Sequence, residues 1–440
     1  MILKVEKLFT YLFLSIPLFL ITGPAIPDII ITIGIIFSII YLFFLKKYKE
    51  ILKINFFRIS VIFWISLIII SIFSYNKNNS FQDAIIFIRF LLIPLCCYFI
   101  FFKDMKIFKK SLFIILILVI FVCIDTFYQF LNYKPESGFG EDLLGFKSNW
   151  YGRLTGPFGN ELIPGSYISK FALLGFAILI SIKNIKNSIL VKSIYLSLIL
   201  YVCYISGERM AFAVFALALF VLFVFLYEQR KSILLSIIFG TLLIIITVYL
   251  HPFYNDFKVL ESTEFHQGQK IEKFFACDHN DQETCTKIVN LQPSFFKIIE
   301  NFTTSAYGEI YLLSYKMFLD NPISGIGINN FEYMCKNFDN YKNMMSNYNC
   351  ASHPHNIYIQ WLTEGGVIVI SCFLLYLFYM ISFILYNKGD REYKVISLVI
   401  ILIMFWPIMS TGSLIKNWYG VITFFIIGLC LCLSKFKNSD

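Results

Sequence analysis

Charged residues are scarce in this chain of 440 residues. Only 15% are Asp, Glu, Lys or Arg, whereas a soluble domain carries about 25%. Hydrophobic residues make up 58% of the chain, and the mean hydropathy is +0.72. This composition excludes an ordinary soluble globular domain.

The sequence also lacks the signature motifs of several enzyme classes. It has no G-x-x-x-x-G-K-[ST] phosphate loop, no H-E-x-x-H zinc motif, and no Asp-x-Asp pair of the kind that metal-dependent sugar transferases carry. We therefore expect no bound metal and no cofactor.

What the chain has instead is a series of long apolar runs with few charges. A helix needs about 20 apolar residues to cross about 30 Å of hydrocarbon, and the runs have about this length. The sequence predicts an all-α polytopic membrane protein with about 12 transmembrane helices. The predicted spans are 8–24, 27–45, 57–74, 84–102, 111–131, 161–182, 190–206, 209–227, 232–250, 356–386, 395–411 and 419–434.

The connections between these runs alternate in charge. One set, with both termini, holds 21 Lys and Arg against seven Asp and Glu, while residues 251–352 hold eight Lys and twelve Asp or Glu. Because basic loops stay in the cytoplasm, this pattern predicts cytoplasmic termini and an external loop over 251–352. The net charge of +9 then reflects topology and not a nucleic-acid partner.

This pattern divides the chain into three parts, with transmembrane bundles at 1–250 and 353–440 and a long external loop, 251–352, between them. A loop of this length is typical of a functional segment. Within it, residues 306–320 repeat apolar residues with helical spacing, which predicts a short amphipathic helix at the membrane surface.

Four of the 11 cysteines lie in the external loop, and the other seven lie in apolar runs. An even number in an oxidising compartment indicates two disulfides. Local pairing of Cys277 with Cys285 and of Cys335 with Cys350 is the simplest of three connectivities. A zinc site is the alternative, although the spacings fit no zinc pattern.

The strongest candidate site is the segment from Ser352 to Gly366, which closes the external loop and opens the next span. His355 lies at the mouth of the predicted helix, where its imidazole could reach a substrate. Asn356, Gln360 and Glu364 have i, i+4, i+8 spacing, so they share one helix face. A capping role for His355 and a metal pair with His353 are the alternatives.

Two arginines beside predicted helix starts could bind an anion. Arg209 follows Ser206-Gly207-Glu208 at the start of a span, where backbone N–H groups and a guanidinium favour phosphate. Arg153 lies among glycines just before another span. The alternatives are interfacial snorkelling for Arg209 and bonding to backbone carbonyls for Arg153.

Three more ionisable residues lie within apolar runs. Arg89 and Asp125 are each about six residues from the external ends of neighbouring predicted spans, so we expect them to form a structural ion pair. Lys170 has no obvious partner in the sequence, and no role is assigned to it.

At these residues the chain resembles the O-antigen ligase and polymerase superfamily of bacterial envelope glycosyltransferases. The order of the motifs, the long external loop and the number of spans also agree. The matching pieces are Ser206-Gly207-Glu208-Arg209, the segment from Asn321 to Phe331, and the segment from His353 to Gly366. Cysteines in the loop are a departure, because the family's loop need not contain them.

The resemblance implies a membrane enzyme that transfers a glycan from an undecaprenyl pyrophosphate carrier at the periplasmic face of the inner membrane. In a ligase the acceptor is a lipid A–core sugar. Arg209 and Arg153 would hold the pyrophosphate, His355 would deprotonate the attacking hydroxyl, and His353, Asn356 and Gln360 would contact substrate. The alternatives are an O-antigen polymerase, a protein O-oligosaccharyltransferase and a non-enzymatic flippase.

The residues also suggest how the transfer would proceed. One well-placed base suits a single displacement with inversion, because a retaining double displacement needs a carboxylate nucleophile as well. Two arginines could supply the charge that other transferases take from a metal. We therefore expect a metal-independent, inverting reaction.

Overall fold

The computed structural model describes residues 2–134, 138–148, 152–182, 188–255, 257–266, 269–276, 288–291, 302–345 and 349–437. Within these ranges the chain is a helical, polytopic membrane protein. Seven helices are long and apolar enough to cross a membrane, and an eighth span results if the bent pair Lys4–Leu14 and Ile16–Thr22 counts as one. The seven are Ala25–Phe44 (α3), Asn55–Ile72 (α5), Lys77–Phe101 (α6, α7 and η1), Met105–Leu131 (α8), Pro164–Ser181 (α9), Tyr227–Leu250 (η3 and α13) and Ile357–Tyr386 (α19).

The predicted number of twelve spans is not confirmed. Three of the predicted runs form the shorter apolar helices α11 (Ile189–Ile205), α12 (Arg209–Phe225) and α21 (Asn417–Leu433). The run predicted at 395–411 is helical only as far as Met404, where α20 (Arg391–Met404) ends. Residues 405–416 form an irregular loop instead, which becomes part of the candidate site.

Side-chain caps define where several helices begin. The carboxylate of Asp104 accepts the Lys106 N–H at 2.8 Å at the start of α8, and the Ser305 hydroxyl accepts the Gly308 N–H at 3.1 Å at the start of α16 (Ala306–Asp320). These bonds satisfy N–H groups that have no partner within the helix. The helix predicted at 306–320 is thus confirmed.

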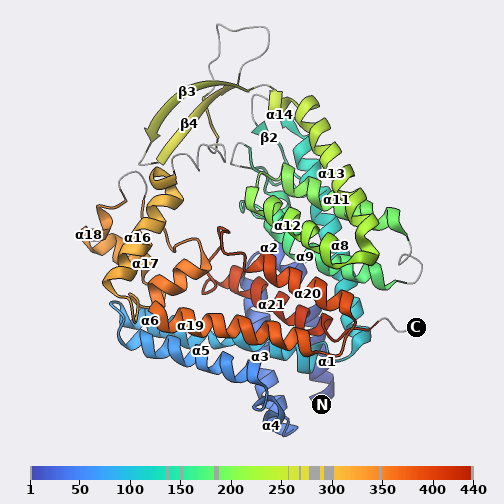
Figure 1. The fold of residues 1–440 in the computed structure, drawn as a ribbon, viewed down its shortest axis with the longest axis vertical. Coiled ribbons are helices and arrows are strands. Elements are labelled where there is room, and N and C mark those ends of the chain that lie inside the picture. Colours follow the sequence, from blue (N-terminus) through green and yellow to red (C-terminus); the bar gives the residue numbers. More distant parts are fainter. Residues whose placement is uncertain are drawn as a thin grey trace.

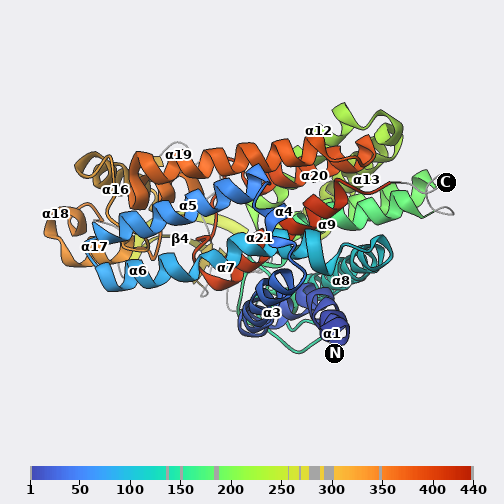
Figure 2. The same ribbon diagram turned by 90° about the horizontal axis from the view of Figure 1, so that it is seen from below.

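Helix α9 lies at the centre of the bundle, in contact with α8, α11, α12 and α20 (Figure 1). Its 18-residue window is 89% buried, compared with 17% for the peripheral α13. Helices α5 and α19 run side by side in both ribbon views (Figures 1 and 2). Helix α20 contacts both α19 and α9, and α21 packs on α20. The helices that carry the Arg209 and His353–Gly366 motifs, α12 and α19, therefore belong to one packed core.

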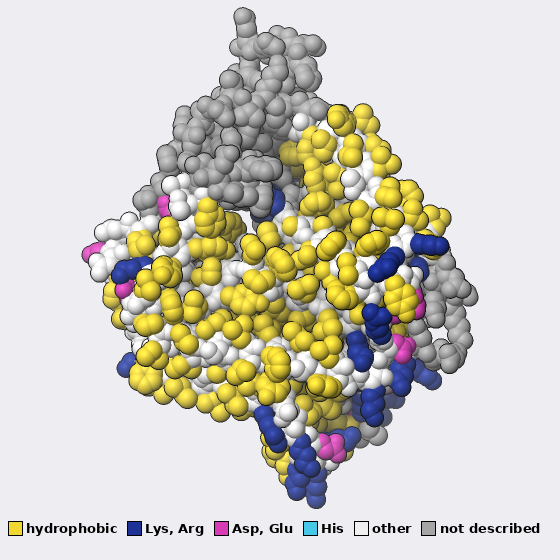
Figure 3. All heavy atoms as spheres, viewed as in Figure 1, with side chains coloured by type: hydrophobic (Ala, Val, Ile, Leu, Met, Phe, Trp, Pro, Cys, Tyr) yellow, Lys and Arg dark blue, Asp and Glu magenta, His cyan; other side chains and the backbone are white. Residues whose placement is uncertain are grey.

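Segments that the charge pattern assigns to the cytoplasm contact one another at one end of the bundle. Lys103 forms a salt bridge with Glu6, and the Phe108 ring contacts the Phe436 ring with centroids 6.1 Å apart. Both chain ends therefore lie at the end of the bundle where α8 begins. In Figure 3, Lys and Arg side chains gather along the lower and right-hand edge of the drawn face, while hydrophobic side chains cover its middle. Which compartment each end faces stays a prediction.

The long loop contains a sheet that the sequence analysis did not predict. Strands β3 (Phe257–His266), β4 (Gln269–Ala276) and β5 (Ile288–Leu291) pair antiparallel in the order β3-β4-β5. The sequence gives this sheet no clear signal, because residues 257–275 do not alternate between apolar and polar side chains. A small second core forms between α16 and α17 (Phe331–Asn337), where Leu313, Met317 and Phe331 are fully buried.

A disulfide between Cys335 and Cys350 closes this second core. It is the local pairing that the sequence favours for these two cysteines. The other proposed pair, Cys277 and Cys285, lies outside the described residues.

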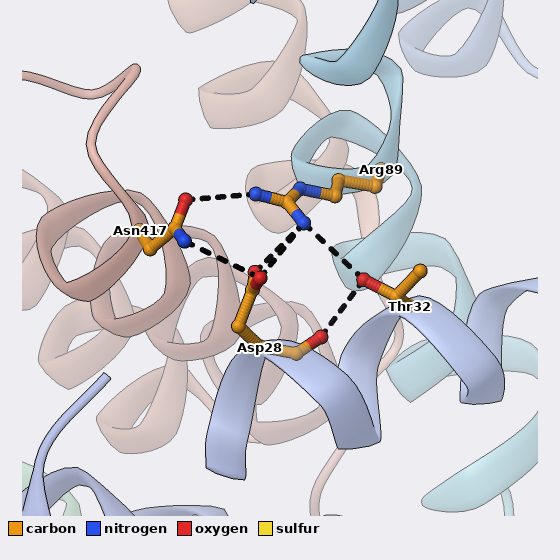
Figure 4. A network of polar contacts seen from close by, with 4 residues as sticks. All are labelled: Asp28, Thr32, Arg89 and Asn417. Atoms are coloured by element: carbon orange, nitrogen blue, oxygen red, sulfur yellow. Dashed lines mark hydrogen bonds and ion pairs between the residues drawn. The ribbon is translucent and has the colours of Figure 1, made fainter. Parts of the chain in front are cut away.

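The expected ion pair between Arg89 and Asp125 is wrong. Arg89 on α7 (Ile88–Cys96) pairs with Asp28 in the first turn of α3, with Nη1 2.9 Å from Oδ1 (Figure 4). Its Nη2 donates to the Asn417 Oδ1 at 2.8 Å, and Nη1 also reaches the Thr32 hydroxyl at 3.3 Å. Similar depth in neighbouring spans did not bring Arg89 to Asp125, because α3 and α21 lie against α7.

Asp125 has a different role. Its Oδ1 accepts the Leu143 N–H at 3.1 Å, and the Asp142 carboxyl lies against it. It thus fastens the loop that follows α8. Burial raises the pKa of Asp142, which favours a proton shared between the two carboxyl groups.

The network around Arg89 joins α3, α7 and α21, so its loss should destabilise the protein. Arg89→Ala leaves Asp28 without its cation and should cost about 1–3 kcal/mol. Thermal unfolding in detergent measures this, with Arg58→Ala as the control, because Arg58 bonds only the Leu52 carbonyl at an exposed site. The exchange of Arg89 and Asp28 should recover part of the loss. Equal midpoints for Arg89→Ala and Arg58→Ala would contradict the role of the network.

Candidate active site

The first half of the site is built on the N-terminus of α19. Asn356 caps this helix, with its Oδ1 accepting the Tyr358 and Ile359 N–H groups at 3.0 and 3.1 Å. Its Nδ2 donates to the carbonyls of Pro407 and Met409 at 2.7 and 3.3 Å. The amide therefore fastens the irregular 405–416 loop to the helix start.

His353 bonds the same loop. Its Nε2 lies 3.2 Å from the Thr411 carbonyl, and its Nδ1 lies 3.0 Å from the Ser352 hydroxyl. Since a carbonyl only accepts, Nε2 must carry the proton and Nδ1 accepts from the serine. Burial lowers the pKa of His353, so this neutral tautomer is the stable form at pH 7.

His355 has a different environment. Its ring lies 4.1 Å from the His353 ring and meets the Tyr307 ring edge-on at 5.8 Å. Among the described residues its imidazole has no hydrogen-bond partner, although its backbone carbonyl accepts the Thr411 N–H at 2.7 Å. Burial, and then the neighbouring His353, lowers the pKa of His355 to about 4. The imidazole is therefore neutral at pH 7.

The backbone of His355 is also strained. Its φ of +55° lies in the left-handed region, which costs a non-glycine residue about 1–3 kcal/mol and persists only where the surroundings enforce it. Such outliers cluster at functional sites. The His355 ring packs on the His353 ring, but the side chains of His353 and Asn356 bond the 405–416 loop and that of His355 does not.

A break in α19 brings the second and third motifs together. Gly366 has φ +62°, which interrupts the helix, and the segment 322–327 lies along the break. There the Ile326 and Gly327 N–H groups bond the Thr363 and Glu364 carbonyls at 3.1 and 2.9 Å. An added Cβ at Gly366 would lie 2.2 Å from the Ile323 carbonyl oxygen. Only glycine allows this approach.

Gln360 and Glu364 lie on the buried face of α19, as their spacing predicts. Gln360 Nε2 donates to Glu364 Oε2 at 3.1 Å and to the Ser413 hydroxyl at 2.8 Å. The second oxygen of Glu364 faces the Phe331 N–H at 3.4 Å, at the start of α17. This polar chain links the 405–416 loop to the second core formed by α16 and α17.

The second half of the site surrounds Glu208. Its two carboxylate oxygens accept the Gly165 and Ser166 N–H groups at 2.7 and 3.1 Å, so it caps the N-terminus of the central helix α9. Burial raises the pKa of Glu208, while Arg153 is the strongest influence opposing the rise. Both oxygens serve the structure, which leaves Glu208 unsuited to act as a nucleophile.

Arg209 and Arg153 flank this cap. Arg209 is the first residue of α12 and is half-buried. Arg153 donates to the Leu162 carbonyl at 2.9 Å, while its buried Nε has no bonding partner within the described part of the chain. The Leu154 N–H bonds the Ser206 carbonyl at 3.1 Å, which holds the two arginine segments together. The structure thus brings the two predicted anion ligands into one region.

The site includes residues that the sequence reasoning missed. Tyr307 of α16 contacts His355, and Ser413 and Thr411 of the 405–416 loop bond Gln360 and His353. Pro407 and the run Ser410-Thr411-Gly412-Ser413 were the available signal that the helix ends early. Among the described residues, no three His, Cys, Asp or Glu side chains lie close enough to hold a metal ion.

Comparison with known families supports this reading of the motifs. A family model described as O-antigen ligase matches residues 194–374, which include Arg209, the 322–327 segment and His355. Residues 194–374 match the O-antigen ligase family. The resemblance seen in the sequence is thereby confirmed. No curated protein sequence matches the chain.

The match to the O-antigen ligase family has a coarse functional meaning. It indicates a membrane glycosyltransferase of the O-antigen ligase or polymerase type. Arg153 precedes the matched segment, yet it lies beside Glu208 within it. Arg153 is therefore close in three dimensions to the matched segment although it precedes it in the chain.

Gly207 lies close to the backbone of Gly152, where the segments that carry Arg209 and Arg153 meet. It has φ +76°, and an added Cβ would lie 2.4 Å from the Gly152 carbonyl oxygen. Gly207→Ala should therefore lower the thermal midpoint, through both backbone strain and this clash. Gly145→Ala is the matched control, because Gly145 has φ +87° with no atom within 4 Å and should lose only the backbone term of about 1–2 kcal/mol. Equal losses would show that the contact with Gly152 is unimportant.

Proposed function

We propose that this protein is an O-antigen ligase, which transfers a glycan from undecaprenyl pyrophosphate to a lipid A–core sugar at the periplasmic face of the inner membrane. The observation that carries the proposal is His355. Its neutral imidazole has no hydrogen-bond partner among the described residues. It lies just before the N-terminus of α19, within the segment that matches the O-antigen ligase family. A positioned base is what the attack of a sugar hydroxyl requires.

In the proposed reaction, His355 takes the proton of the acceptor hydroxyl as its oxygen bonds the anomeric carbon of the donor sugar. The bond between that carbon and the pyrophosphate oxygen breaks, and its electron pair leaves with undecaprenyl pyrophosphate. Transfer occurs in one displacement and inverts the anomeric carbon. The engagement of both Glu208 oxygens in capping α9 supports this, because a retaining reaction needs a free carboxylate.

The leaving group gains negative charge as the bond breaks, so cations placed beforehand lower the barrier. Arg209 at the N-terminus of α12 and Arg153 beside it would supply this charge, together with the helix N–H groups. His353 and Asn356 bond the 405–416 loop, so in this proposal they position His355, while Gln360 holds the loop through Ser413.

Purified protein, incubated with a lipid-pyrophosphate-linked glycan and lipid A–core, tests the function. We expect covalent transfer to the core, unchanged by EDTA because the two arginines supply the charge. Transfer only onto a second carrier-linked glycan would identify a polymerase, and transfer onto a protein a protein-glycosylating enzyme. Carrier movement across vesicles without any transfer would identify a flippase. Loss with EDTA and return with Mg²⁺ would refute the metal-independent reaction.

His355→Ala should abolish transfer but leave binding of the lipid-linked donor nearly unchanged, because it removes the base and leaves the arginines in place. General base catalysis contributes about 10²–10⁴-fold in rate, and we expect a loss within this range. His355→Asn is the second variant, because asparagine accepts the left-handed backbone that alanine resists. Transfer restored by His355→Asn would show that the strained backbone matters and the imidazole does not.

A further inference from the structure

Lys170 lies two turns into α9, the most buried of the long helices. Its side chain is 7% exposed, although a buried ammonium is costly within a membrane-spanning helix. Its Nζ donates to the Ser166 carbonyl at 3.3 Å and to the Ser166 hydroxyl. Such a cation marks a functional position unless its partners explain it.

On one side, Lys170 faces the arginine half of the site. Ser166 is shared, because its backbone N–H binds the Glu208 carboxylate at 3.1 Å while its carbonyl and hydroxyl bind the ammonium. Glu208 directly precedes Arg209 in the chain. The charge of Lys170 also acts on Glu208 through space. The lysine thus stabilises the Glu208 carboxylate, which caps α9 and belongs to the residue directly before α12.

On its other side, Lys170 faces the histidine half of the site. Its Nζ lies 5.4 Å from the centre of the Tyr419 ring, which attracts a cation to its face. The 405–416 loop packs on this ring, since an added Cβ at Gly412 would lie 2.8 Å from Tyr419 Cγ. Thr411 of that loop then bonds both His353 and the His355 backbone at 3.2 and 2.7 Å.

We propose that Lys170 is a positioning residue that fixes the distance between the anion-binding arginines and the histidine base. It connects Glu208 and Arg209, through Ser166, with His353 and His355, through Tyr419 and Thr411. The inference rests on the proposed function for its kinetic consequence only, because the contacts stand without it.

Steady-state kinetics separate this role from the alternatives. Lys170→Met should lower kcat by about 10–100-fold, because misplacement of reacting groups costs this much. Both KM values should change by less than about threefold, because each half still binds its own substrate. Lys170→Arg, which keeps the charge, should recover part of kcat. Lys192→Met is the matched control, because Lys192 is 4% exposed and bonds Gln229 at the opposite end of the bundle.

Each contrary kinetic result would overturn the proposal. A raised KM for the donor with unchanged kcat would make Lys170 a direct ligand of the carrier. If the double variant Lys170→Met/Glu208→Gln recovered kcat, the role of Lys170 would be limited to neutralising Glu208. A kcat equal to that of Lys192→Met, per folded protein, would show no positioning role.

Hydrogen–deuterium exchange tests the connection without reference to catalysis. Lys170→Met should increase amide exchange in 405–416 and at the start of α12, whereas Lys192→Met should leave both segments as in the wild type. Unchanged exchange in both segments would refute the connection, even in a protein that transfers glycan. If the wild type shows no transfer but the exchange result holds, the proposed function fails and the positioning role remains.

Discussion

The break of α19 at Gly366 is the constraint on which the packing of α16 and α17 against the helix bundle depends. A broken helix leaves carbonyls without partners, and at membrane depth each must be satisfied by protein. The segment 322–327 supplies the missing donors to Thr363 and Glu364, and the Val367 N–H bonds the Pro322 carbonyl at 2.9 Å. The glycines of this segment and of α19 permit backbone to lie on backbone. The first turns of α19, which directly follow the candidate base His355, are thereby fixed to the segment that joins α16 and α17.

A second theme is the use of buried carboxylates at helix N-termini. Glu208 caps α9, and Glu364 faces the first N–H of α17. A carboxylate is favourable there because free N–H groups and the helix dipole attract negative charge. The start of α12 is different, since its first residue is Arg209 and its cap, Glu208, turns its carboxylate towards α9. This is the helix start at which we propose that the pyrophosphate of the donor binds.

Much of this arrangement could be predicted from the sequence, and the failures have physical causes. Apolar runs located the helices, and the i, i+4, i+8 spacing placed Gln360 and Glu364 on the buried face of α19. Arg89 was assigned the wrong partner, because depth in the membrane says nothing about which helices are neighbours in three dimensions. The early end of α20 was missed because apolar residues continue through Phe405, Trp406 and Met409. Hydropathy measures compatibility with the membrane and not helical structure.

The irregular 405–416 loop explains why neighbouring polar residues at the mouth of α19 have different roles. Its carbonyls need donors, and residues 353–358 provide them. Tyr358 bonds the Phe405 carbonyl at 2.7 Å, Asn356 bonds those of Pro407 and Met409, and His353 bonds that of Thr411. The His355 side chain, in contrast, makes no hydrogen bond to the loop among the described residues. Two of its neighbours, His353 and Asn356, satisfy the backbone carbonyls of the loop. The neutral imidazole of His355 is therefore left without a hydrogen-bond partner in the described part of the chain and is available to a substrate hydroxyl.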